Sequence, residues 1–113
     1  LIPFVEPGGW LVMQEDGGNE TPGSYREFVD GIVYDLPDGR CLAWVTPFHV
    51  EHEERDAAFV EQIREGIAAQ PCHAIVEWAA MVSEDPDLYL VDGLHPGPFG
   101  AQTLADMVEA VTG

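Results

Sequence analysis

The sequence predicts an α/β fold in which helices cover both faces of a parallel sheet. Three short apolar runs, with Gly or Pro residues before or after them, have the length and composition of buried strands. Between these runs, apolar residues recur at spacings of three and four, as on one face of a helix. Strands that alternate with helices in this way form parallel sheets with right-handed crossovers. The 113 residues, 46% of them hydrophobic, suffice for one domain with a small core.

The first strand and helix are expected near the N-terminus. The run Trp10-Leu11-Val12-Met13 lies between the glycine pairs at 8–9 and 17–18 and predicts a buried strand. A helix is predicted from Ser24 to Leu36, with Ser24 or Thr21 as its N-cap and with an apolar face of Tyr25, Phe28, Val29, Ile32, Val33 and Leu36. Residues 37–39, Pro-Asp-Gly, end that helix in a turn.

A second strand and a second helix are expected next in the sequence. The run from Cys41 to Thr46 predicts a buried strand that Pro47 closes. A helix is predicted from Asp56 to Ala69, because Val60, Ile63 and Ile67 fall on one face. The acidic residues that lead into it suit the positive end of a helix dipole: Glu51, Glu53, Glu54 and Asp56.

The C-terminal part predicts one more strand, from His73 to Glu77, and a short helical piece from Trp78 to Val82. An irregular loop is expected from Asp85 to Pro96. The last helix is expected to start near Pro98, with an apolar face of Leu104, Met107, Val108 and Val111. The three tryptophans lie on or beside strands and are expected in the core: Trp10, Trp44 and Trp78.

The charge balance excludes several classes of partner. Asp and Glu number 21 against 4 Lys and Arg, and the formal net charge is −17. No basic patch is available to neutralise phosphates, so nucleic acid and anionic membranes are not expected partners. No apolar run approaches the roughly 20 residues that a membrane helix needs. Cys41 and Cys72 are compatible with a disulfide in an oxidising compartment, such as the outside of the cell, and equally with two buried thiols.

Polar residues follow the predicted strands at what we call the carboxyl edge, the edge of the sheet where parallel strands end and ligands usually bind. The loop carrying Asp92 and His95 can fold back to this edge, and a carboxylate at that spacing can orient an imidazole that acts as a base. Asn19 follows the first strand, where its amide could donate to an oxyanion. A surface loop and a plain turn are the alternatives for these two features.

A His-x-x-His cluster follows the second strand. His49 and His52, with Glu51 between them, are ligand types for a divalent metal. No cysteine or further patterned ligand joins them, so we expect a solvated acidic loop, and neither a metal nor another cofactor. His49 is expected to line the carboxyl edge and contact substrate. His73 begins the third strand at the far end and is expected to be structural.

Taken in order, these segments resemble a known family, the SGNH (GDSL-type) hydrolases. Residues 12–20, Val-Met-Gln-Glu-Asp-Gly-Gly-Asn-Glu, resemble its third conserved block, a strand ending in Gly-x-Asn-Asp, although Glu20 replaces the usual Asp. The strand at 44–47 resembles the next core strand. Residues 92–96, Asp-Gly-Leu-His-Pro, followed by Gly100 and a helix, resemble the fifth block, Asp-x-x-His-Pro. The resemblance spans nearly all of this chain but only about the C-terminal half of the family's domain.

The resemblance implies ester or acyl hydrolysis, as in esterases and lipases, on a three-layer flavodoxin-like sheet. Residues 1–113 would be one partial domain with the three C-terminal strands and their flanking helices. His95 would be the general base, Asp92 its orienting carboxylate and Asn19 an oxyanion donor. Gly18 and His49 would contact the substrate.

The family's nucleophile has no counterpart in this sequence. It is a Ser in a Gly-Asp-Ser block, whereas Ser24 is expected to be a helix cap and Ser83 a loop residue. A base without a nucleophile cannot carry out acyl transfer. We therefore expect a separate N-terminal chain or a cleaved fragment, consistent with a start at Leu1.

The strand at Trp10–Met13 would then be a bare hydrophobic edge. Such an edge can pair with the nucleophile-bearing chain or with a second copy in a homo-oligomer. The alternative is a catalytically inactive SGNH-like module with a structural or binding role in a larger assembly.

Overall fold

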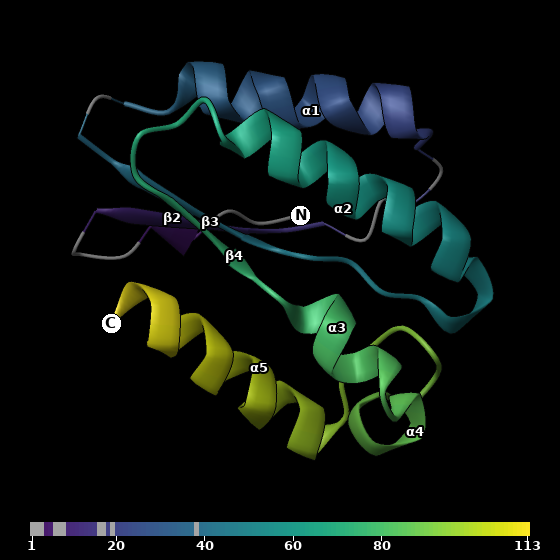
Figure 1. Cartoon of the computed structure of the whole chain (residues 1–113). Coiled ribbons are helices and arrows are strands. Elements are labelled where there is room, and N and C mark those ends of the chain that lie inside the picture. Colours follow the sequence, from purple (N-terminus) through teal and green to yellow (C-terminus); the bar gives the residue numbers. More distant parts are fainter. Residues whose placement is uncertain (1–3, 6–8, 16–17, 19, 38) are drawn as a thin grey trace.

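A computed structural model describes residues 4–5, 9–15, 18, 20–37 and 39–113 (Figure 1). One sheet lies between two layers of helices. The strands follow the order β1 (Phe4–Val5), β2 (Trp10–Gln14), β3 (Cys41–Val45) and β4 (His73–Val76). β2, β3 and β4 are parallel. The predicted three-stranded parallel sheet with flanking helices is confirmed.

One face of the sheet is covered by α1 (Pro22–Asp35) and α2 (Glu53–Ile67). Thr21 is the N-cap of α1, and Ser24 completes a capping box: the Ser24 amide donates to Thr21 Oγ1 and the Thr21 amide to Ser24 Oγ. α2 starts three residues before the predicted Asp56, directly after the short 3-10 helix η1 (Val50–His52). The buried core on this face consists of Met13, Tyr25, Val29, Leu42, Trp44, Phe59, Ile63 and Ile67.

The opposite face is covered by α3 (Trp78–Ser83), α4 (Pro86–Tyr89) and α5 (Pro98–Thr112). The expectation of an irregular loop from Asp85 to Pro96 is wrong in its first part. Pro86 has the backbone angle of a first helical residue, and its carbonyl accepts the Leu90 amide at 2.8 Å. Ser83 was expected in a loop but is the last residue of α3.

The expectation of a bare edge at Trp10–Met13 is also wrong in part. β1 pairs with β2 in antiparallel fashion, with Phe4 opposite Val12 and Val5 opposite Leu11. Trp10 itself is half-buried, whereas Trp44 and Trp78 are buried as predicted. Among the described residues, β1 pairs with two of the five residues of β2, Leu11 and Val12.

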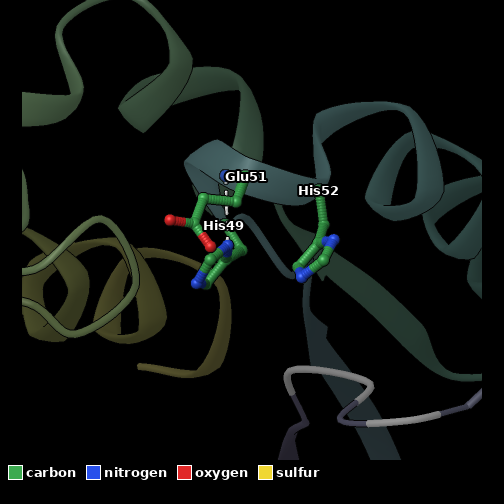
Figure 2. Close-up of side chains that lie close together, drawn as sticks. All are labelled: His49, Glu51 and His52. Carbon is green, nitrogen blue, oxygen red and sulfur yellow. Dashed lines mark hydrogen bonds between the residues drawn. The ribbon is translucent and has the colours of Figure 1, made fainter.

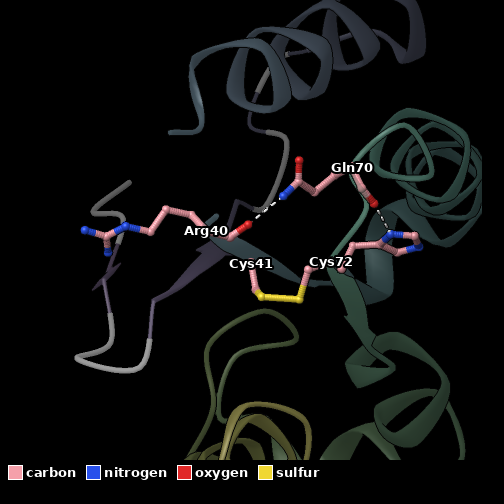
Figure 3. The surroundings of a disulfide bond; sticks show 5 residues. Arg40, Cys41, Gln70 and Cys72 are labelled. Carbon is pink, nitrogen blue, oxygen red and sulfur yellow. Dashed lines mark hydrogen bonds between the residues drawn. A yellow bond between two sulfur atoms is a disulfide. The ribbon is translucent and has the colours of Figure 1, made fainter. Parts of the chain in front are cut away.

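A disulfide joins Cys41, the first residue of β3, to Cys72, the residue just before β4 (Figure 3). It decides between the two alternatives that the sequence leaves open. Next to it, the Gln70 side-chain amide donates to the Arg40 carbonyl at 2.6 Å. The amino ends of the two strands are thus connected both covalently and by a hydrogen bond. Among the described residues, no helix has the length and apolar character that crossing a membrane requires.

Candidate active site

Asp92 and His95 are in direct contact in the loop between α4 and α5. Asp92 Oδ2 lies 2.6 Å from His95 Nδ1. The other oxygen, Oδ1, accepts the backbone amides of Leu94 at 3.0 Å and His95 at 2.7 Å. An Asp carboxylate that accepts hydrogen bonds from the backbone amides two and three residues later in the sequence closes a tight turn. That turn brings the imidazole of His95 onto the carboxylate, as the Asp-x-x-His spacing predicts.

These contacts keep Asp92 ionised. The His95 amide lowers the pKa of Asp92 most, followed by the His95 imidazole and the Leu94 amide. Both side chains are exposed, 52% for Asp92 and 69% for His95. A carboxylate that stays charged can fix the proton of a neutral imidazole on Nδ1 and stabilise the imidazolium that forms when Nε2 accepts a proton.

Backbone hydrogen bonds place this loop at the carboxyl edge. Val91 donates to the His95 carbonyl at 2.9 Å, and Val50 donates to the Gly93 carbonyl at 3.0 Å. Gly93 has φ +84°, and a Cβ atom there would lie 2.6 Å from Val50 Cγ2. The contact between Gly93 and Val50 holds the loop against η1, which follows the end of β3.

His49 lies in that segment after β3, as expected. It is half-buried and is the N-cap of η1, because its Nδ1 accepts the Glu51 amide at 3.1 Å. Its ring centroid is 4.9 Å from that of His52. The structure thus brings the segment that carries His49 next to the loop that carries Asp92 and His95. Substrate contact by His49 stays a prediction.

Gly18, which follows β2 in the sequence, is held by Arg55, at the start of α2. One Arg55 nitrogen donates to the Gly18 carbonyl at 2.7 Å, and the guanidinium also contacts Asp56 at 3.2 Å. It lies 5.0 Å above the ring of Phe59. Gly18, the predicted substrate contact, is therefore fixed to α2. Asn19 lies outside the described residues, so its role as an oxyanion donor stays a prediction.

Asp56 is a residue whose role the sequence analysis missed. Its side chain is 2% exposed, and burial raises its pKa, while Arg55 and the His49 backbone amide oppose that shift. Together, Arg55 and Asp56 connect the Gly18 segment with the His49 segment. The sequence signal was limited to an acidic residue in the first turn of a helix, which does not distinguish a buried Asp from a solvated one.

Thr46 is a second missed residue, and it joins the ends of two strands. It is fully buried, its hydroxyl donates to the Val76 carbonyl at 3.2 Å, and it accepts the Ala79 amide at 2.9 Å. The end of β3 is thereby bonded to the end of β4 and the start of α3. A hydroxyl residue at the end of a buried strand is the signal that could have indicated this role.

The other histidine and the two serines considered in the sequence make local hydrogen bonds to backbone carbonyl groups. His73 is exposed at the start of β4, where its Nδ1 lies 2.6 Å from the Gln70 carbonyl oxygen. The Ser24 hydroxyl donates to the Thr21 carbonyl at 3.2 Å, at the start of α1. The Ser83 hydroxyl donates to the Ala80 carbonyl at 3.0 Å, within α3. These bonds are typical of capping and helix-surface serines, not of activated nucleophiles.

Comparisons with protein-family models, curated proteins and solved structures give no match for this chain. What the site can do chemically follows from its own groups. An imidazole oriented by an ionised carboxylate can accept a proton from a hydroxyl and return it to a leaving group.

Proposed function

We propose that this chain is the C-terminal portion of an SGNH-type acyl hydrolase. It would supply the general base His95, its orienting carboxylate Asp92 and the oxyanion donor Asn19, on a sheet of the flavodoxin-like type. The 2.6 Å contact between Asp92 and His95, inside the sequence Asp-Gly-Leu-His-Pro, is the observation that supports this proposal most strongly. The nucleophilic serine would come from residues outside this sequence or from another polypeptide.

In the proposed reaction, His95 accepts a proton and then donates it, once in each half of the reaction. With its Nδ1–H donated to Asp92, its Nε2 accepts the serine proton as the serine oxygen attacks the ester carbonyl carbon. The tetrahedral oxyanion receives hydrogen bonds from donors that include the Asn19 amide. Nε2 then protonates the departing alcohol as the carbon–oxygen bond breaks. Water cleaves the acyl-enzyme by the same two proton transfers, releasing the acid and the serine.

Apolar side chains that contact the loop of Asp92 and His95 suggest which part of the substrate lies there. Val50 and Val91 are 38% and 69% exposed, and their amides bond to the loop that holds His95. Exposed apolar side chains next to a base suit the acyl group of an ester. His49 and Gly18 would complete the contacts with the substrate on the β3 and β2 sides.

The strand β2 is the proposed joining point for the nucleophile-bearing portion. In SGNH hydrolases the strands that this chain lacks lie beside the counterpart of β2. The part of that edge that pairs with no described residue of β1 would accept such a neighbour, or a second copy of the chain.

Activity-based labelling of protein purified from its source tests the proposal. A fluorophosphonate probe should label a polypeptide with a Gly-Asp-Ser sequence that either contains this chain or co-purifies with it. Replacing His95 by Ala should abolish labelling, because the serine is no longer activated. His73→Ala is the matched control, since it removes an exposed imidazole at the opposite end of β4.

Two results would overturn the proposal. One is mass spectrometry of the native sample that finds no polypeptide with Gly-Asp-Ser. The other is labelling that His95→Ala and Asp92→Asn leave unchanged. Both results would favour a catalytically inactive module with a role in assembly.

A further inference from the structure

We propose that His49, Glu51 and His52 form a binding site for a divalent transition-metal ion of the zinc type. Each of the three residues offers one ligand atom, and these atoms lie within 4.8 Å of one another. Figure 2 shows the three side chains projecting to the same side of η1, with the Glu51 carboxylate turned toward His49. This inference does not depend on the proposed hydrolase function.

The local backbone explains why the ligands converge. A 3-10 helix has three residues per turn, so side chains at positions i and i+3 lie above one another. His49 is the N-cap of η1 and His52 its last residue, and their ring centroids are 4.9 Å apart. The His52 amide also donates to the His49 carbonyl at 2.9 Å, which fixes this turn. The backbone thus brings both imidazoles together before any ion binds.

The ligand set selects the kind of ion. Two imidazole nitrogens and one carboxylate oxygen suit Zn²⁺ and neighbouring transition metals, whereas Ca²⁺ and Mg²⁺ prefer oxygen ligands alone. Three protein ligands leave one position of a tetrahedral ion for water or another small ligand. The nearby carboxylates of Glu53 and Glu54, exposed at the start of α2, add negative charge that favours a cation.

The side chains can rearrange around an ion at small cost. Within the described part of the chain, the side chains of Glu51 and His52 make no hydrogen bond, and both are exposed. His49 accepts one hydrogen bond, from the Glu51 amide at 3.1 Å, and ion binding through this imidazole would exchange that bond for the metal. An ion would also hold η1, whose Val50 amide bonds to Gly93 in the loop of His95.

Calorimetric titration of the full chain with Zn²⁺ alone, after removal of metals with a chelator, tests the site. We expect one ion per chain, and each of His49→Ala, Glu51→Gln and His52→Ala should weaken binding by at least about tenfold. His73→Ala and His95→Ala, which remove imidazoles elsewhere, should bind Zn²⁺ as the unchanged chain does. An excess of Mg²⁺ or Ca²⁺ should not displace the ion.

Each contrary result would overturn the inference. Absence of Zn²⁺ binding would do so directly. Binding that is lost in His95→Ala and kept in His52→Ala would place the ion at the Asp92 and His95 pair instead. Displacement by Mg²⁺ would indicate general attraction to the acidic surface. Because His52 and Glu51 are exposed, their variants keep the test valid even where replacement of the half-buried His49 disturbs folding.

Discussion

Asp92 holds His95 through both of its oxygens, since Oδ2 contacts the imidazole at 2.6 Å while Oδ1 accepts the His95 amide at 2.7 Å. The second contact fixes the backbone from which the ring projects. The carboxylate therefore fixes the position of the imidazole and of the backbone that carries it. The proposed role of His95 as a general base needs such positioning, and here it is achieved inside a segment of four residues.

The first prediction concerns the ionisation of Asp92. Because two amides and the imidazole lower its pKa, its carboxylate should remain ionised at pH values below the ordinary 3.8. His95→Ala should raise this pKa only in part, since the amides of residues 94 and 95 still donate. Carbon-13 NMR titration of the aspartate carboxyls measures both effects. An Asp92 pKa at or above 3.8 in the unchanged chain would contradict the geometry of the pair.

The second prediction concerns the disulfide, whose cysteines are 31 positions apart. Replacing both Cys41 and Cys72 by Ser should lower the free energy of unfolding by about 2–4 kcal/mol, because the unfolded chain regains the freedom that the crosslink removes. Urea unfolding of the two proteins measures the difference. The unchanged chain in a reducing agent should match the double variant, and equal stability in all three cases would show that the crosslink does not form.

The third prediction concerns the buried carboxyl group of Asp56. Burial raises its folded pKa above the unfolded value near 3.8, so the folded state binds the proton more tightly. Its contribution to stability is therefore fully present below pH 3.8 and is lost as the pH rises through the raised folded pKa. Asp56→Asn should lack this loss, so the stability of the unchanged chain relative to the variant should fall across that window.

The control for this prediction removes one negative charge from the surface. Glu27→Gln changes an exposed side chain of α1 by the same one charge. Urea unfolding of the three proteins at a series of pH values gives their free energies of unfolding. The difference from the unchanged chain should vary with pH for Asp56→Asn and stay constant for Glu27→Gln. A constant difference between Asp56→Asn and the unchanged chain would mean that the carboxyl is not desolvated.

The fourth prediction concerns Gly93, which positions the loop of the candidate site. Gly93→Ala should cost about 1–2 kcal/mol for the left-handed backbone. The substitution should lower the stability further, because the new Cβ would clash with Val50 Cγ2 at 2.6 Å. Gly39→Ala separates the two effects, since Gly39 has φ +83° and no atom of the described residues lies within 4 Å of the same Cβ position. Thermal unfolding should show the larger loss for Gly93→Ala, and equal losses would exclude the Val50 contact.

The spacing of apolar residues in the sequence sufficed to predict the helices and strands that pack through a regular apolar face. The parallel strands and the three long helices occur close to their predicted ranges, because each buries one face or both against the same sheet. The Asp92 and His95 contact also followed from sequence, because both partners lie within one turn. Segments with few residues were harder, and α4 was missed because four residues carry no helical period.

Contacts between distant segments could not be predicted from sequence. Thr46 bonds to Val76, 30 positions away, and Arg55 to Gly18, 37 positions away. Neither pair has a local spacing that indicates contact. The pairing of β1 with β2 was missed for a different reason, since two residues are too few for an alternating pattern.

The proposed site requires Asn19 and His95 to lie close together at the carboxyl edge, and a spin label measures that proximity. A nitroxide attached at Asn19→Cys, with Cys41 and Cys72 paired in their disulfide, should broaden the imidazole NMR signals of His95 and His49. The signals of His73, at the other end of β4, should stay sharp. Sharp His95 signals in the labelled protein would contradict a shared site.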